Sequence, residues 1–338
     1  MRNVLITGGA GFIGTNLALD RLSRGDHVRV LDTCARLGTK DNWEMLERLG
    51  DNRLELVAMD VRDAEGVQTV VKDVDAIFHL AAQVAVTTSV SDPVMDFEVN
   101  AAGTLSVLEA ARASARRPVL VYASTNKVYG SLDHEAVERR ETRYRLSGLP
   151  LGIPETQQLD FHSPYGCSKG AADQYVLDYA RIYGLRTVVF RQSCIYGPWQ
   201  RGNEDQGWVA HFVAKALGGE EICLYGDGLQ VRDVLFIEDL LEAYQRALES
   251  ADAVAGRPYN IGGGPMHTTS LLEFVDLLGE LLGTPIDVRF SEWRPGDQRV
   301  YVSDVRRAAE DLGWEPRTPL RDGVEQLLSW LSKSTGVV

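Results

Sequence analysis

The sequence is poor in the residues that build metal centres and disulfide frameworks. Its four cysteines are scattered along the chain, and none has the spacing of a metal-binding or redox-active pair: Cys34, Cys167, Cys194 and Cys223. We therefore expect reduced thiols and no metal site, which is the usual state of cysteines in a cytoplasmic protein.

Long hydrophobic runs and an excess of positive charge are also missing. The first apolar run, Val4 to Ile6, is cut short by Gly8, so we expect no signal peptide. No later run has the roughly 20 apolar residues that a membrane-spanning helix needs. The formal net charge is −13, whereas a nucleic-acid-binding protein needs a basic face. We expect no membrane partner and no nucleic-acid partner.

Strand and helix patterns alternate along the first half of the chain. Short apolar runs typical of buried strands occur at residues 3–7, 27–32, 54–59, 76–80, 119–123 and 186–191. Amphipathic patterns follow several of them, including long ones at about 93–112 and 170–183. This alternation predicts an α/β fold, a Rossmann doubly wound parallel sheet with helices on both faces.

The second half is less regular and predicts a smaller mixed α/β C-terminal substrate domain. Helical patterns at residues 208–217, 237–249 and 323–334 are mixed there with strand patterns at 221–225, 230–236 and 286–290. We expect a first domain over residues 1–195 and a second mainly over 196–338. Segments near 230–262 are expected to return to the first domain.

A glycine-rich loop follows the first predicted strand. Gly8, Gly11 and Gly14 stand between that strand and an amphipathic helix, where a dinucleotide-binding loop should lie. Asp32 ends the next strand, at the position where an acidic residue binds the adenosine ribose. A carboxylate there repels a 2′-phosphate, so we expect NAD, although the nearby Arg36 and Lys40 leave NADP open.

The stretch from Tyr165 to Lys169 carries a candidate proton-transfer pair. Residues four apart share one face of a helix, so the phenol and the ammonium can lie side by side. A nearby cation lowers the pKa of a phenol, which makes the pair suited to moving the proton of a hydroxyl group. Ser124 and Thr125 end a predicted strand and can add a hydroxyl to the same site.

In combination, these motifs resemble the extended short-chain dehydrogenase/reductase family. The resemblance covers nearly the whole chain and rests on Gly8 to Gly14, Asp32, His79 to Ala82, Ser124 to Gly130, Tyr165 with Lys169, and Arg191 to Pro198. It implies a nucleotide-sugar enzyme that keeps its NAD bound, with Thr125, Tyr165 and Lys169 as catalytic residues.

One branch of the family, the CDP-paratose 2-epimerases, is more similar still. The similarity rests on residues 125–130, 159–183 and 204–208, and on Arg143 with Tyr144. It implies inversion at C2 of a nucleotide-activated hexose through a 2-keto intermediate, as in O-antigen sugar metabolism. Trp199 stands where related sequences tend to carry arginine, which puts the fine substrate preference in doubt.

Three alternatives stay open at this point. The first is a nucleotide-sugar 4-epimerase, and the second is a 4,6-dehydratase. Dehydratases carry an Asp-Glu pair where this chain has Asn126 and Lys127, and an amide with an ammonium is a poor substitute for a carboxylic acid and a carboxylate base. The third is a non-catalytic NAD-sensing relative, which the intact catalytic set argues against.

The resemblance also implies which residues contact the two ligands and how the chains assemble. Further cofactor contacts are expected from Phe12, Ile13, Asp60, Val61, Leu80, Ala81, Ala82, Gln83, Asn100, Ser124, Gln192 and Ser193. Substrate contacts are expected from Thr87, Thr125, Asn126, Lys127, Arg143, Tyr144, Gln206, Leu224, Tyr225, Arg232 and Arg294, with Arg232 and Arg294 on the pyrophosphate. Helices at about 93–112 and 170–183 are expected to pair copies into a homodimer or a homotetramer.

Overall fold

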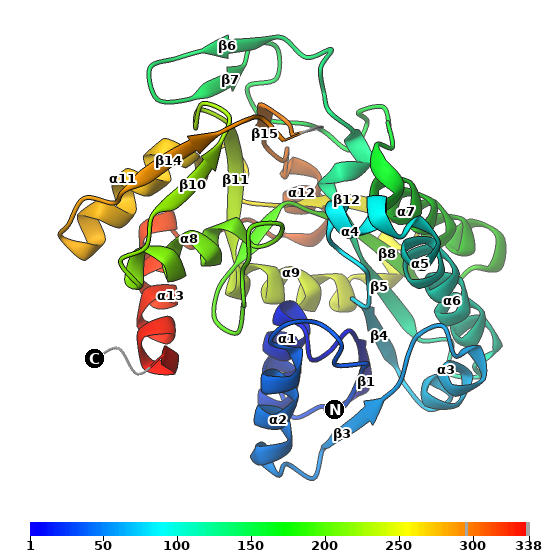
Figure 1. The fold of residues 1–338 in the computed structure, drawn as a ribbon. Coiled ribbons are helices and arrows are strands. Elements are labelled where there is room, and N and C mark those ends of the chain that lie inside the picture. The colour runs from blue at the N-terminus through cyan, green and yellow to red at the C-terminus, as the bar shows by residue number, and fades with distance from the viewer. Residues whose placement is uncertain (295–296, 336–338) are drawn as a thin grey trace.

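A computed structural model describes residues 1–294 and 297–335, with side chains described up to residue 333. Its largest element is a seven-stranded parallel sheet, which confirms the predicted fold class (Figure 1). The strand order is β12 (Arg257–Ile261), β8 (Thr187–Gln192), β5 (Val119–Thr125), β4 (Ala76–His79), β1 (Asn3–Thr7), β2 (His27–Asp32) and β3 (Leu54–Ala58). The reversal of order at β1 and β4 is typical of doubly wound sheets.

Helices cover both faces of this sheet because successive strand residues point to opposite sides. In β1, Val4 and Ile6 pack in one apolar cluster and Leu5 in another. The first cluster is shared with α1 (Phe12–Ser23), α2 (Thr39–Leu49) and α9 (Ile237–Glu249). The second is shared with α3 (Ala64–Val71), α6 (Gly103–Ala113) and α7 (Ser163–Tyr183).

The helix expected at residues 93–112 is divided. α5 (Pro93–Phe97) leads through a π-helical turn, η1 (Glu98–Ala102), into α6, and the short helix α4 (Val86–Ser91) precedes it. The helix expected from residue 170 begins earlier, at Ser163. Pro164 stands in its first turn, where a missing amide hydrogen and a fixed φ favour helix initiation.

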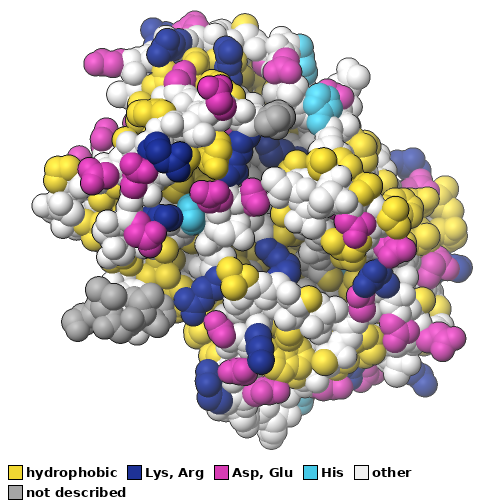
Figure 2. Space-filling view, viewed as in Figure 1, with side chains coloured by type: hydrophobic (Ala, Val, Ile, Leu, Met, Phe, Trp, Pro, Cys, Tyr) yellow, Lys and Arg dark blue, Asp and Glu magenta, His cyan; other side chains and the backbone are white. Residues whose placement is uncertain are grey.

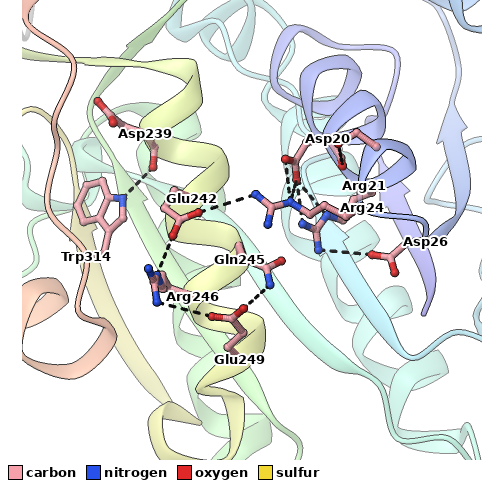
Figure 3. Close-up of polar contacts among 11 residues, drawn as sticks. Asp20, Arg21, Arg24, Asp26, Asp239, Glu242, Gln245, Arg246, Glu249 and Trp314 are labelled. Atoms are coloured by element: carbon pink, nitrogen blue, oxygen red, sulfur yellow. Dashed lines mark hydrogen bonds and ion pairs between the residues drawn. The ribbon is translucent and has the colours of Figure 1, made fainter. Parts of the chain in front are cut away.

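α9 belongs to the second half of the sequence but packs beside α1 on the main sheet. Figure 3 shows the polar contacts along these helices, in which Arg24, directly after α1, reaches Glu242 of α9 at 3.8 Å. Arg21, only 1% exposed, pairs with Asp20 at 2.9 Å and with Asp26 at 3.5 Å. Within the segment 230–262, α9 thus packs on the main sheet, and β12 is one of the strands of that sheet.

The remaining elements build a second region beside the carboxyl edge of the main sheet (Figure 1). Its strands form a mixed sheet of β9 (Cys194–Tyr196), β11 (Val231–Phe236), β13 (Thr268–Ser270) and β15 (Val300–Tyr301), a parallel pair of β10 (Ile222–Tyr225) and β14 (Val288–Ser291), and a hairpin of β6 (Val137–Arg139) and β7 (Tyr144–Leu146). Its helices are α8 (Trp208–Leu217), α11 (Leu271–Leu282) and α13 (Leu320–Thr335), while the shorter α10 (Ala251–Val254) and α12 (Arg306–Leu312) lie near β12 and α9.

No helix within residues 1–294 and 297–335 combines the length and the apolar character that crossing a bilayer requires.

Candidate active site

The glycine-rich loop joins β1 to α1 at the carboxyl edge of the main sheet. Gly8 has a φ of +68°, which an L side chain rarely adopts, and a Cβ there would lie 2.7 Å from the Ala81 nitrogen. A Cβ on Gly14 would lie 2.4 Å from the Gly8 oxygen. These glycines therefore let the first turn of α1 lie directly on the loop. α1 has Gly11 at its N-cap and no side chain bound to its first amides, so that end fits a phosphate group.

Asp32 closes this loop from the end of β2. Its two carboxylate oxygens accept from the Ala10 amide at 3.0 Å and from the Cys34 amide at 2.8 Å. At the end of β3, Asp60 pairs with Arg62 at 2.8 Å, beside the buried Val61. The predicted ribose ligand Asp32 and the predicted cofactor contacts Asp60 and Val61 thus lie at the ends of neighbouring strands. This arrangement fits a dinucleotide laid across the sheet edge.

Tyr165 lies in the first turn of α7 and is 8% exposed. Burial raises the pKa of its phenol, while a side-chain hydrogen bond with Thr125 and the charge of Arg36 act in the opposite direction. The sequence led us to expect a pKa lowered by Lys169. The difference arises because Lys169 is turned to other partners, so desolvation dominates at the phenol.

Lys169 is 3% exposed, and its ammonium donates to the Ala123 carbonyl oxygen at 2.7 Å. It also lies 4.3 Å from the centre of the Tyr122 ring. Burial lowers the pKa of Lys169 to about 7, against the charges of Asp173 and Asp96. Lys169 is therefore a buried residue whose ammonium loses its proton near neutral pH.

Thr125 and its neighbours end β5 beside Tyr165. The Thr125 hydroxyl accepts from the Lys127 amide at 3.2 Å, which starts the short 3₁₀ helix η2 (Asn126–Tyr129). Ser124, by contrast, donates to Asp173 at 2.7 Å inside the protein. The predicted hydroxyl of Thr125 thus faces the site, whereas that of Ser124 is committed to the core.

A second buried network fixes the loop after β4. The Asn100 amide group bonds the Gln83 backbone in both directions, at 2.8 and 3.0 Å, and donates to Ser168 at 3.0 Å. Ser168 in turn donates to Asp96 at 2.5 Å, and burial raises the pKa of Asp96. The loop from Leu80 to Gln83 is thereby tied to α7, which carries Tyr165. Sequence reasoning missed Asp96 and Ser168. The presence of Asp96 among the apolar residues of α5 was the signal that could have indicated a buried polar contact.

Lys127 and Arg232 form a basic cluster. Figure 2 shows Lys and Arg side chains in the hollowed middle of the face in view. Lys127 approaches Gln298 at 3.5 Å, and its pKa is lowered by burial and by the charge of Arg232. Arg232 is 8% exposed and pairs with Asp297 at 2.5 Å. Sequence reasoning named Arg232 and Lys127 but missed Asp297, whose distance along the chain hides the pairing.

Residues 203–206 form a tight turn that we call the strap. The side-chain oxygen of Asn203 accepts hydrogen bonds from the backbone amides of Asp205 and Gln206, both at 2.9 Å. On one side, Thr87 of α4 donates to Asp205 at 3.1 Å. On the other side, Arg294 donates to the Glu204 carbonyl oxygen at 2.7 Å. The strap therefore bridges the main sheet and the second region.

Arg294 and Tyr225 lie together at the far end of the strap. The Arg294 guanidinium stands 3.9 Å from the centre of the Tyr225 ring and 3.7 Å from an Asp205 oxygen. Tyr225 also donates to Glu204 at 3.4 Å. The two predicted substrate residues are thus brought together on the second region, with acidic groups of the strap against them.

Other residues expected at the site have side chains engaged elsewhere. Arg143 is bound to Glu273 and Thr268, and Tyr144 donates to Asp227 at 2.6 Å. Leu224 is fully buried. The side chain of Gln192 donates to the Tyr244 hydroxyl, and that of Ser193 donates to Asp233. Each of these partners comes from a distant segment, which sequence spacing does not reveal.

Comparison with known proteins finds one matching family model and similar proteins that catalyse different reactions. The family model described as GDP-mannose 4,6 dehydratase matches residues 5–327. CDP-paratose 2-epimerase from Salmonella typhi is 45% identical over 97% of this chain and 99% of its own length. UDP-glucose 4-epimerase from Mycolicibacterium smegmatis is 32% identical over 96% and 97%. The structure of dTDP-glucose 4,6-dehydratase from Streptomyces venezuelae, which holds NAD, is 31% identical with a TM-score of 0.84, and the match covers 99% of this chain and 98% of that one.

Proposed function

This chain belongs to the GDP-mannose 4,6-dehydratase family, and from that membership we propose that it is an NAD-dependent isomerase that inverts C2 of a nucleotide-activated hexose. The observation that carries the proposal is the 45% identity to a CDP-paratose 2-epimerase over nearly the full length of both chains. The UDP-glucose 4-epimerase from Mycolicibacterium smegmatis and a dTDP-glucose 4,6-dehydratase from Xanthomonas campestris are each 32% identical. We therefore propose a CDP-activated 3,6-dideoxyhexose of the paratose and tyvelose kind as the substrate.

Two side chains beside Thr125 support this choice over dehydration. Asn126, 8% exposed, and Lys127 occupy the positions where the resemblance places the acid and the base of water elimination. Burial and the charge of Arg232 lower the pKa of Lys127, so its ammonium loses a proton more readily. An amine is nevertheless no substitute for the carboxylate base of water elimination. The site therefore retains a group for moving a hydroxyl proton and lacks the usual pair for expelling water.

The residues at the sheet edge fit NAD. The uncapped start of α1 offers amides to the diphosphate, and Asp32 offers carboxylate oxygens to the adenosine ribose. When bound there, NAD would supply a hydride acceptor for the sugar carbon, and return of the hydride would leave no net oxidation. Lys169, whose ammonium donates to the Ala123 carbonyl oxygen, would hold ribose hydroxyls of the cofactor through its remaining N–H groups.

Tyr165 is the group that handles the proton. Its oxygen takes the proton of the C2 hydroxyl as that carbon becomes a carbonyl and gives it back once the sugar has turned over. Burial raises the pKa of the phenol and so holds it protonated, while the hydrogen bond with Thr125 and the positive charge of Arg36 favour its action as a base. Thr125 also orients the reacting oxygen.

The second region supplies the tether that a turning sugar needs. Arg232 and Arg294 would hold the diphosphate, since guanidinium groups are always charged and bind two oxygens at once. We propose that residues 196–338, apart from α9 and β12, form this nucleotide-sugar domain. A strongly held diphosphate and a loosely held hexose let the keto sugar present its other face.

The proposal is tested by proton NMR of the purified protein without added NAD. CDP-paratose, CDP-glucose, GDP-glucose and UDP-glucose are supplied in separate reactions. A new anomeric signal of the manno configuration, with no keto product, is the expected result. A galacto-configured product or a 4-keto-6-deoxy sugar would overturn C2 inversion in favour of the neighbouring reactions.

The role of Tyr165 has a matched control on the same helix. Tyr165→Phe is expected to lower kcat by about 10²–10⁴-fold, the usual contribution of a positioned acid or base. Tyr175→Phe removes the same oxygen from a residue of α7 that is 47% exposed, and it is expected to leave kcat unchanged. Equal turnover in the two variants would contradict the catalytic assignment.

We also propose that two copies pair through α5 and α7. These helices carry exposed apolar side chains that a monomer would leave in water: Val94 at 66%, Phe97 at 57%, Ile182 at 61% and Tyr183 at 42%. Figure 2 shows hydrophobic side chains gathered at the edge where α5 and α7 lie in Figure 1. Light scattering is expected to give a dimer or tetramer, and Phe97→Glu is expected to shift it toward monomer. A monomeric wild-type protein would contradict the pairing.

A further inference from the structure

Tyr122 lies in β5 directly before Ala123 and is fully buried, on the side of the main sheet that α6 and α7 cover. The Lys169 ammonium of α7 stands over its ring, 4.3 Å from the ring centre. The same ammonium donates to the Ala123 carbonyl oxygen at 2.7 Å. Lys169 thus contacts two consecutive residues of β5, the aromatic face of one and the backbone oxygen of the other.

The position of the Tyr122 ring is fixed from the neighbouring strand. In the register of the sheet it lies beside His79 of β4, and the two rings stack with their centres 5.6 Å apart and their planes at 30°. The hydroxyls of Thr7 and Thr104 hold the His79 ring at 2.7 and 2.9 Å. Burial lowers the pKa of His79 to about 3, so this ring is neutral near pH 7 and does not repel the ammonium.

The negative charges that act on Lys169 are those of Asp173 and Asp96. Asp173 of α7 accepts two hydrogen bonds of 3.0 Å from Arg191. Asp96 of α5 accepts a hydrogen bond of 2.5 Å from Ser168. Both carboxylates are thus engaged with other donors, and the Tyr122 ring is in direct contact with the ammonium.

An aromatic ring stabilises a buried ammonium differently from a carboxylate. The negative face of the ring attracts the cation, most strongly where water is excluded. This attraction uses no N–H group and cancels no charge, whereas a carboxylate would do both. Burial raises the pKa of the Tyr122 phenol well above its usual value, so this residue offers a ring without a charge of its own.

We propose that Tyr122 is a positioning residue of the active site, whose ring holds the Lys169 ammonium in place and keeps it charged while leaving its N–H groups to the cofactor. The inference rests on the proposed function, in which those N–H groups hold ribose hydroxyls of NAD. Burial lowers the pKa of Lys169 to about 7, so a modest attraction decides how much of the lysine is charged near neutral pH.

The test follows Lys169 itself and does not depend on turnover. Protein labelled with carbon-13 at the lysine Cε is titrated by NMR, and Lys169→Met identifies the signal of Lys169. Tyr122→Leu is expected to lower the pKa of Lys169 by about 1 pH unit, whereas Tyr122→Phe keeps the ring and is expected to keep the wild-type value. The alkaline limb of the kcat profile is expected to move by the same amount in Tyr122→Leu.

A second series separates the attraction from packing, because Tyr122→Leu also leaves space in the core. Phenylalanines with one, two and three ring fluorines replace Tyr122, and each fluorine withdraws electron density from the ring face with little change in size. The pKa of Lys169 is expected to fall stepwise along this series. Phe78→Leu is the control, since Phe78 is a fully buried ring of β4 in the cluster on the other side of the sheet. It is expected to lower stability and to leave the titration of Lys169 unchanged.

Two outcomes would overturn the proposal while leaving the proposed function intact. One is an equal titration of Lys169 in the wild type, in Tyr122→Leu and along the fluorinated series. The other is an equal shift in Phe78→Leu, which would assign the effect to a loosened core. A wild type that turns over no nucleotide sugar would contradict the proposed function alone, because the titration of Lys169 is measured without substrate.

Discussion

The two sides of the site are held together in different ways. On the side of Tyr165 and Lys169, buried polar networks fix the backbone, and we call this side, built of β5, α7 and β8, the fixed wall. On the other side, Lys127, Arg232, Arg294 and the strap form what we call the exchangeable wall. Its two arginines pair with carboxylates, and we propose that a bound diphosphate replaces these carboxylates. A reaction that moves one proton precisely, yet lets a sugar turn over, needs both kinds of wall.

The fixed wall centres on Asp173 of α7. This carboxylate binds Arg191 of β8 through two hydrogen bonds of 3.0 Å, and the two side chains are 0% and 3% exposed. Arg191 also donates to Tyr129 at 3.1 Å, and Tyr129 donates to Asn260 at 2.7 Å. Every polar side chain of this network has a hydrogen-bond partner, which offsets the free-energy cost of its burial. The network therefore holds the ends of the strands in one position.

The ion pairs of the exchangeable wall are more exposed to solvent. The side chains of Arg232 and Asp297 are 10% and 24% exposed, and those of Arg294 and Asp205 are 33% and 43% exposed. Each of these arginines has a carboxylate against it. A diphosphate brings more charge than either carboxylate, so substrate binding can exchange these partners without leaving an unpaired ion.

The largest effect is expected from breaking the fixed wall. Asp173→Ala leaves Arg191 charged and buried without its carboxylate, and we expect a loss of about 3–5 kcal/mol in the free energy of unfolding. Asp178→Ala on the same helix breaks a pair with Arg181 in which the side chains are 47% and 72% exposed, and a change within about 1 kcal/mol is expected. Urea unfolding measures both at equal protein concentration. Similar losses in the two variants would show that burial does not separate the two classes of pair.

The sequence predicted much of the fixed wall and little of the exchangeable one. The main strands and the helices at residues 208–217 and 237–249 are confirmed, because hydrophobic periodicity is a local property. The start of α7 was missed, although Pro164 marks it. The division of the helix at η1 has no equally clear signal.

Side-chain partners were the part that spacing could not supply. Arg143 was expected at the sugar, but it is bound to Glu273, which lies 130 residues later in the chain. Arg232 was named without its partner Asp297, which is 65 residues away. The sequence fixes neither distance nor direction between such pairs, because both depend on how the second region folds back. The roles assigned to Thr125, Tyr165, Lys169 and the arginines stay predictions.

A smaller effect is expected from a pH change at the edge of the fixed wall. His79 of β4 is fully buried between the hydroxyls of Thr7 and Thr104, at 2.7 and 2.9 Å. Burial lowers the pKa of His79 to about 3. The unfolded chain therefore binds a proton below pH ~6.5 that the folded protein does not, and stability is lost as the pH falls from there toward 3. The loss from this residue is about 2 kcal/mol at pH 5.

His79→Gln tests this expectation by its slope. Glutamine does not titrate, so the free energy of unfolding is expected to fall less between pH 7 and pH 5 than in the wild type, by about 2 kcal/mol, even if the variant is less stable at both. His134→Gln changes a histidine that is 58% exposed and is expected to keep the wild-type slope. Parallel curves for wild type and His79→Gln would mean that His79 is not held neutral.

The smallest effect is expected at the strap. We expect the Asp205 carboxylate to compete with the substrate diphosphate for the Arg294 guanidinium. Asp205→Asn removes this competing charge and is therefore expected to strengthen binding of the substrate or of CDP. An ion pair this exposed is worth about 0.2–1 kcal/mol, so the gain in affinity is about 1.5–5-fold. Asparagine keeps an oxygen for the hydroxyl of Thr87, which leaves the strap fastened to α4.

Calorimetric titration with CDP measures this gain, and Asp276→Asn is its control. Asp276 is an exposed carboxylate of α11, so its removal makes the same change in net charge outside the strap. A gain confined to Asp205→Asn, and reduced at high salt, means that the carboxylate acts locally on Arg294. Equal gains in both variants would assign the effect to the net charge of −13 and would contradict partner exchange. The contrast in burial thus predicts that a carboxylate lost from the fixed wall costs stability, whereas one lost from the exchangeable wall improves binding.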